Sequence, residues 1–149
     1  MKYLLYIVSL SLLFTTCSKK EEDVEEIGPE PQIAFVSLDP LVVENFKNSV
    51  TLTISYKDIN GDLGFENPDV YSLSVKDGRL DEEDWYHVPP LAPPGYEIPI
   101  QGNLQIVLNS MFILGNGDTE EVSLSVKLRD RAGNWSNIIN TPIVVIKKP

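Results

Sequence analysis

The chain has 149 residues, a formal net charge of -10, one cysteine and one histidine. This length supports one sizeable hydrophobic core, so we predict a single folded domain. An acidic surface repels nucleic acid and attracts cations, and Cys17 and His87 on their own cannot form a zinc site. Nucleic acid is therefore excluded as an expected partner.

The first predicted element is a secretory signal peptide over residues 1–16. Lys2 precedes an apolar run from Tyr3 to Phe14, and small hydroxyl residues follow it. The run is shorter than the roughly 20 residues that a membrane-spanning helix needs. We therefore expect the segment to be removed, which leaves a chain that is more acidic still because Lys2 is its only charged residue.

Cys17 follows this signal directly. The stretch LLFTTCS resembles the lipobox of bacterial lipoproteins, in which the cysteine is lipidated and becomes the new N-terminus. The resemblance implies a membrane partner through a lipid anchor, because several acyl chains on one cysteine bind a bilayer stably. The alternative is an ordinary signal peptide with Cys17 as an unmodified passenger.

Residues 17–30 predict a disordered acidic tether, because they are charged, contain Gly28 and Pro29, and show no apolar period. The cluster of Glu21, Glu22 and Asp23 resembles the export signal that sends lipoproteins of Bacteroidota to the outer face of the outer membrane. This resemblance implies a lipid-anchored outer-membrane protein at the cell surface, with the periplasmic face as the other option. A merely solvated spacer is the alternative interpretation of the same charges.

Residues 31–149 predict an all-β fold. Apolar residues alternate with polar ones, as in SVTLTISYK and EVSLSVKLR, and no stretch has a helical period. Seven such strands predict a seven-stranded antiparallel β-sandwich. Their order resembles immunoglobulin-like and fibronectin type III domains, and Pro142 indicates that the last strand lies at a sheet edge. The seven segments are 33–38, 49–57, 70–76, 85–88, 103–109, 121–129 and 138–147.

In the order that this resemblance implies, three connections lie at one end of the sandwich: residues 57–69, 89–102 and 130–137. DINGDLG at 58–64 should therefore face DRAGNWSN at 130–137. We expect this end to be presented away from the membrane.

The two facing loops carry oxygen-bearing side chains. Asp58, Asn60 and Asp62 alternate as in the first half of a calcium loop, and Asp130 and Asn134 would complete the ligand set, so calcium is the cofactor that we predict. DRAGN resembles a segment of bacterial immunoglobulin-like modules, and both motifs together resemble a pattern in small Bacteroidota lipoproteins. The alternative is that these residues form turns without an ion, because Asp and Asn bond to their own backbone.

The same end carries three aromatic residues, Phe65, Tyr96 and Trp135. Together they could form a binding surface for a glycan or peptide. The alternative is that they close the end of the sandwich.

No catalytic motif is recognisable. The carboxylate run from Asp81 to Asp84 is best interpreted as a solvated loop, and the chain has no nucleophile elbow and no phosphate-binding glycine loop. We expect a non-catalytic, lipid-anchored envelope protein that binds a glycan or protein. The alternative function is a structural or assembly subunit of an outer-membrane envelope complex.

Overall fold

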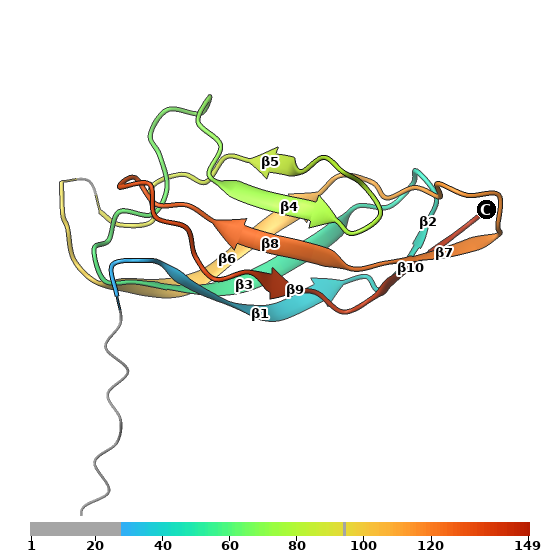
Figure 1. Ribbon diagram of the computed structural model, residues 1–149, viewed down its shortest axis with the longest axis horizontal. Helices are drawn as coiled ribbons and strands as arrows, with labels where there is room; N and C mark the ends of the chain where they lie inside the picture. The colour runs from blue at the N-terminus through green and yellow to red at the C-terminus, as the bar shows by residue number, and fades with distance from the viewer. Residues whose placement is uncertain (1–27, 94) are drawn as a thin grey trace, which may run out of the picture.

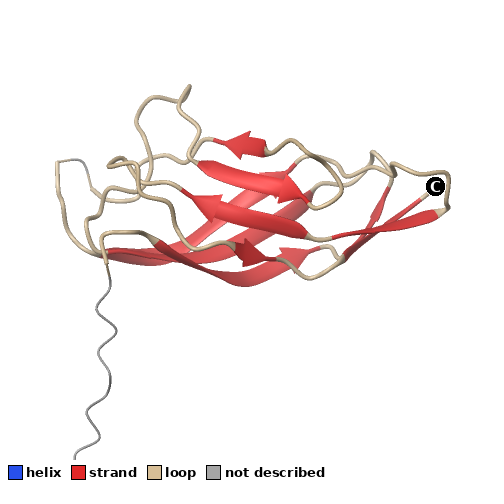
Figure 2. Ribbon diagram, in the orientation of Figure 1, coloured by secondary structure: helices blue, strands red, loops and turns tan. Residues whose placement is uncertain are grey.

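The computed structural model describes residues 28–93 and 95–149. The predicted signal peptide, Cys17 and most of the predicted tether lie outside these residues. The described chain forms two packed layers of strands without a helix, and its C-terminus lies at one end of the long axis (Figures 1 and 2). No helix in this part of the chain is long and apolar enough to cross a membrane.

Ten strands make up the described fold. They form three sheets with the orders β1-β3-β6, β5-β4-β8-β9 and β2-β10-β7. Their bounds are β1 Gln32–Asp39, β2 Val42–Glu44, β3 Val50–Asp58, β4 Leu73–Asp77, β5 Asp84–Tyr86, β6 Ile100–Leu108, β7 Thr119–Val122, β8 Leu124–Leu128, β9 Ile139–Asn140 and β10 Val144–Lys147.

The alternating pattern explains how the two large sheets pack. Leu52 and Ile54 of β3 and Val126 and Leu128 of β8 are fully buried and belong to one apolar cluster between the layers. Burying a side chain of this size contributes about 1.5–3 kcal/mol. The predicted all-β fold is therefore confirmed, with the core where the strand alternation places it.

The predicted count of seven strands is wrong, although each predicted segment overlaps an observed strand. The strand expected over 121–129 is interrupted at Ser123, and the strand expected over 138–147 is interrupted at Thr141 to Ile143. There the Thr141 hydroxyl oxygen accepts a bond of 3.0 Å from the Leu124 N–H, and Pro142 has no N–H to offer a ladder. Side-chain bonding and proline thus divide two long strands into β7, β8, β9 and β10.

The antiparallel prediction is wrong for one pair. β2 lies parallel to β10, with Val145 opposite Val42. β2 has only three residues, too few for an alternating pattern to be visible in the sequence. The prediction that the last strand lies at a sheet edge is wrong for β10, which lies between β2 and β7; β9 does lie at an edge, and Pro142 stands between these two strands.

The edge formed by β1 is partly covered. The side-chain amide of Asn137 accepts a bond of 2.9 Å from the Ile33 N–H and donates one of 2.8 Å to the Ile33 carbonyl. The register of β1 with β3 also shifts between Phe35 and Ser37. One side chain thus joins the two layers and occupies backbone groups that would otherwise be free at the edge.

Candidate functional site

The three connections predicted to meet do lie at one end of the sandwich (Figure 1). Leu63 and Asp130 form an isolated antiparallel bridge, and the Arg131 N–H donates to the Asp62 carbonyl at 3.1 Å. The Leu91 N–H donates to the Leu63 carbonyl, also at 3.1 Å. Backbone hydrogen bonds therefore hold DINGDLG between the other two loops.

Asp58 organises the DINGDLG turn. Its carboxylate accepts hydrogen bonds from the N–H groups of Asn60 at 3.2 Å, Asp62 at 2.8 Å and Leu63 at 3.2 Å, and the residue is 2% exposed. A short acidic side chain that bonds to backbone two or more residues ahead stabilises a tight turn. Both carboxylate oxygens are therefore engaged inside the loop.

Asp130 has the same role in the neighbouring loop. Its carboxylate accepts from the Asn134 N–H at 2.7 Å and from the Asn134 side-chain amide at 2.9 Å, and the residue is fully buried. Asn134 thus contacts Asp130 as the calcium hypothesis requires. It does so with its N–H groups, which cannot bind a cation.

Asp62 differs from both. Its Oδ2 accepts from the Ala132 N–H at 3.0 Å, and its Oδ1 is buried without a hydrogen-bond partner. Burial raises the pKa of the Asp62 carboxyl; Asp130 and Asp58 raise it further, while the Ala132 N–H and Arg131 oppose them. Asp62 thus differs from Asp58 and Asp130 because one of its carboxylate oxygens is buried without a hydrogen bond.

Calcium binding stays a prediction. Asn60 turns its side-chain amide toward the Pro29 carbonyl, with Nδ2 and the oxygen 3.4 Å apart. Across residues 28–93 and 95–149, no group of three or more His, Cys, Asp and Glu side chains has a geometry that could hold a metal ion. The hydrogen bonds of Asp58 and Asp130 favour the turn interpretation.

We expect Asp62→Asn to raise the melting temperature at pH 7 by about 2 °C. The asparagine keeps an oxygen for the Ala132 N–H and removes a charge from beside two buried carboxylates. Because the native pKa of Asp62 is raised, the native state holds this proton more tightly than the unfolded chain, and ionisation lowers stability as the pH rises. The rise in melting temperature caused by Asp62→Asn should therefore be absent below about pH 4, the pKa of Asp62 in the unfolded chain. It should be complete above the pKa of Asp62 in the native state.

Thermal melts from pH 3 to pH 8 measure this effect, and a lower melting temperature of the variant at pH 7 would contradict it. Repeating the melts of the wild type with calcium and with a chelator tests the metal prediction. A rise with calcium that Asp62→Asn abolishes would establish an ion at this end. An unchanged melting temperature would leave the loops as turns.

The point where the described chain enters the sandwich argues against the expectation that this end is presented away from the membrane. β1 begins here, with Gln32 opposite Lys57, and Pro29 contacts Asn60. The described chain therefore enters the sandwich at the DINGDLG end, and the C-terminus lies at the other end (Figure 1).

The three aromatic residues predicted to form one surface have different surroundings. Phe65 is half-buried and donates its N–H to the Val88 carbonyl at 2.9 Å, whereas Tyr96 is exposed beside the proline-rich loop. Trp135 lies against Trp85, with ring centroids 5.9 Å apart and planes tilted by 59°. The aromatic partner of Trp135 thus comes from a strand of the sheet.

Trp85 and Trp135 lie on the outer face of the β5-β4-β8-β9 sheet. Ser74 of β4 pairs with Trp85 of β5 on one side and with Lys127 of β8 on the other. The side chains of these residues therefore lie on the face of the sheet away from the buried leucines and valines. Trp85 is 43% exposed and Trp135 37%. We call Trp85, Trp135, Lys127 and Arg129 the tryptophan platform.

Two cations complete this platform. The Lys127 ammonium lies 5.0 Å from the ring centroid of Trp135 and 5.9 Å from that of Trp85, and the Arg129 guanidinium carbon lies 5.5 Å from that of Trp135. Such cation–π contacts contribute about 0.5–1 kcal/mol at exposed sites. They hold two large rings at the surface in a fixed arrangement.

Glu83 links the platform to the sheet. It accepts from Lys127 Nζ at 3.0 Å and from the Ser74 hydroxyl at 2.8 Å, and these two bonds lower the pKa of Glu83 despite some desolvation. Arg129 has no ion-pair partner within the described chain, and its Nε is buried without a hydrogen bond. The platform is therefore a locally cationic, aromatic area on an acidic protein.

Sequence reasoning did not identify Trp85, Lys127 or Arg129 as site residues. The alternation of side chains along the strand could have indicated two of them. Lys127 and Arg129 alternate with the buried Val126 and Leu128, so they must face outward. That Trp85 lies next to Lys127 depends on the order of β5, β4 and β8, which strand patterns do not specify.

The described fold and this platform define an all-β sandwich with an exposed aromatic area. Neither a protein-family model nor a curated protein matches the chain. Among solved structures, the chain is similar to a mutant of the SrpA adhesin from Streptococcus sanguinis, with 16% sequence identity and a TM-score of 0.35. The match covers 80% of this chain and 57% of that chain, so this chain spans little more than half the length of that structure.

Proposed function

We propose that the protein is a non-catalytic binding protein of the cell envelope that recognises a glycan through the tryptophan platform. The observation that carries this proposal is the pair of exposed tryptophan rings held 5.9 Å apart on one sheet face. Sugar rings expose C–H faces between their hydroxyl groups, and a tryptophan ring offers a matching apolar surface with little side-chain entropy to lose.

The polar neighbours suit the same ligand class. Lys127 and Arg129 carry donors, and Glu83 carries acceptors, around the rings. A contiguous exposed apolar area on a soluble domain often marks a binding site. The strand order β1-β3-β6 against β5-β4-β8-β9 supports the immunoglobulin-like or fibronectin-like interpretation of the scaffold.

We expect Trp85→Ala and Trp135→Ala each to weaken glycan binding at least tenfold. An aromatic residue that a ligand covers at the centre of a binding site commonly contributes about 2 kcal/mol or more to the binding free energy. A tenfold loss of affinity corresponds to about 1.4 kcal/mol. The experiment is a glycan array with the purified full-length protein, followed by titration of the retained glycan.

Phe46→Ala is the matched control, because Phe46 is also an exposed aromatic residue but stacks on Phe112, away from the platform. It should leave glycan binding unchanged. Thermal melts show whether each variant is folded. If no glycan is retained, or if both tryptophan variants bind as the wild type does, the proposal fails. Co-purification of a stoichiometric envelope protein would then favour the assembly-subunit function.

The proposal places the protein on the outer membrane through acyl chains on Cys17. Eleven residues, 18–28, separate Cys17 from Pro29 and would span at most about 40 Å when extended. Since Pro29 lies beside Asn60, this anchor would keep the DINGDLG end nearest the membrane and leave the platform on the side of the sandwich.

Cys17→Ser should move the protein from the membrane fraction to the soluble fraction and abolish incorporation of labelled palmitate. Protease treatment of intact cells then distinguishes the cell surface from the periplasmic face. Retention of the variant in the membrane fraction would contradict lipid anchoring.

A further inference from the structure

β6 is a long free edge. It pairs with β3 over nine residues without a register shift, from Ile100 opposite Asp58 to Leu108 opposite Val50, and it ends the order β1-β3-β6. Apart from its β3 ladder, no hydrogen bond of residues 100–108 is found within the described chain. Alternate N–H and C=O groups along β6 therefore point away from the sheet without a protein partner.

The sequence of this edge lacks the usual protection. IQGNLQIVL contains no charged residue and no proline, although charged residues make up 23% of the chain. Proteins commonly place lysine, proline or a bulge on an exposed edge strand to prevent another strand from pairing with it.

The other edges of the described sheets are short or covered. β1 carries a register shift and is covered in part by Asn137. β2 and β5 have three residues each, and β9 has two. β7 carries Glu120 and Glu121. β6 is thus the edge at which an added strand would form the longest ladder.

A cavity lies at the C-terminal end of this edge, where the two layers are open between β5 and β6. Its volume is about 330 Å³, and its lining includes Val75, Asp77, Asp84, Tyr86, Leu108 and Phe112. Val75 and Leu108 are core residues, so a side chain that entered this cavity would reach the apolar interior.

Two carboxylates, Asp77 and Asp84, line the cavity. Asp81 and Glu82, both exposed and without an ion-pair partner in the described chain, lie in the connection that leads to Asp84, the first residue of β5. A second copy of this chain would bring the same acidic side chains and another net charge of -10, which opposes pairing of two β6 edges. Charge complementarity therefore favours a cationic partner.

We propose that β6 accepts an extended basic segment of a partner protein as an added strand, with one apolar side chain of that segment in the cavity beside Leu108. Backbone hydrogen bonds to the free edge supply affinity in this mode, and alternate side chains supply specificity. The lysine or arginine residues of the segment lie near Asp81, Glu82 and Asp84. This site is separate from the tryptophan platform and does not depend on glycan binding.

The probe is a nonapeptide of alternating lysine and valine, compared with the same peptide N-methylated at every backbone nitrogen. Both have the same charge, but the methylated peptide cannot donate to a strand edge. The full-length protein should bind the unmodified peptide at least tenfold more tightly, and amide hydrogen exchange should slow at alternate residues of 100–108.

The double variant Asp81→Asn with Glu82→Gln should weaken binding of the unmodified peptide about threefold or more at low salt, whereas Glu121→Gln on β7 should not. If the two peptides bind equally well, their shared charge accounts for binding without backbone hydrogen bonds to β6, and the proposal is overturned. Slowed exchange outside β6, or a dimer that buries β6 in the absence of peptide, would also overturn it. Glycan binding by the same preparations reports separately on the platform.

Discussion

Replacing Arg79 with alanine should lower the free energy of unfolding by about 3 kcal/mol. The side chains of Arg79 and Asp77 are each only 14% exposed. Arg79 Nη2 lies 2.6 Å from Asp77 Oδ2, and Nε donates to Asp77 Oδ1 at 3.0 Å. Removing the guanidinium leaves a mostly buried carboxylate without its counter-charge.

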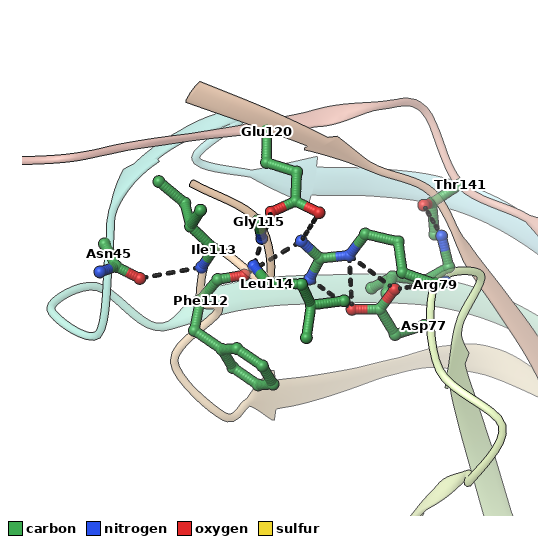
Figure 3. A network of polar contacts seen from close by, with 10 residues as sticks. Asn45, Asp77, Arg79, Phe112, Ile113, Leu114, Gly115, Glu120 and Thr141 are labelled. Atoms are coloured by element: carbon green, nitrogen blue, oxygen red, sulfur yellow. Dashed lines mark hydrogen bonds and ion pairs between the residues drawn. The ribbon is translucent and has the colours of Figure 1, made fainter. Parts of the chain in front are cut away.

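The same side chain holds the connection between β6 and β7 (Figure 3). Arg79 Nη1 donates to the Phe112 carbonyl at 3.0 Å and lies 3.3 Å from Glu120 Oε1, while Glu120 Oε2 accepts from the Leu114 N–H at 2.6 Å. We therefore expect Arg79→Ala to increase hydrogen exchange at residues 109–118 as well as to lower global stability.

Equilibrium unfolding in urea measures the loss. Arg79→Lys is the conservative control, because it keeps the charge but not the forked geometry, and it should lose about half as much. A triple variant, Arg79→Leu with Asp77→Asn and Glu120→Gln, should recover part of the loss because no buried charge is left unpaired. A loss below about 1 kcal/mol for Arg79→Ala would show that this network contributes little.

The pH dependence of this network has a definite sign. Burial raises the pKa of Glu120, but the N–H groups of Leu114 and Gly115 and the charge of Arg79 outweigh it, so the net pKa is lowered. A carboxyl with a lowered native pKa stabilises the protein above its unfolded pKa of about 4 and loses this contribution as the pH falls through the native value. The difference between wild type and Arg79→Ala should therefore narrow in acid.

Replacing Asp58 with alanine should lower the free energy of unfolding by about 3 kcal/mol and the melting temperature by roughly 10 °C. Asp58 accepts three backbone hydrogen bonds inside the DINGDLG turn while it is almost completely buried. The substitution removes the acceptor and leaves these N–H groups without a protein partner, which is more costly than losing an exposed bond.

Asp58→Asn keeps one acceptor oxygen and should lose less than half as much. Asn60→Ala is a control in the same turn, since its side chain makes one long exposed bond to the Pro29 carbonyl. Thermal and urea unfolding of the three variants measure how much stability each substitution costs. Equal losses for Asp58→Ala and Asn60→Ala would contradict the role that we assign to the Asp58 carboxylate.

Alternating apolar and polar residues are enough to predict the local conformation of most strands. Alternation in 49–57 and 121–129 specifies which side chains face inward, because successive residues of a strand point to opposite faces. The resemblance to immunoglobulin-like and fibronectin type III domains implied that residues 57–69 meet 130–137, because the strand order of those domains brings these connections to the same end. The hydrogen bonds between Asp62 and the 131–132 backbone confirm that meeting.

Which strands lie next to one another depends on packing between distant parts of the chain. Two contacts join residues far apart in the chain: the pairing of β2 with β10, and the contact of Trp135 with Trp85. The free edge of β6 likewise follows from the order of the strands in the sheet. An alternating sequence pattern does not specify any of these, because it is the same whichever strand lies alongside. The interruptions at Ser123 and Pro142 depend on a hydrogen bond from Leu124 to Thr141 across the sheet. Local patterns thus determine the faces of the strands, whereas the platform and the free edge arise from packing between distant segments.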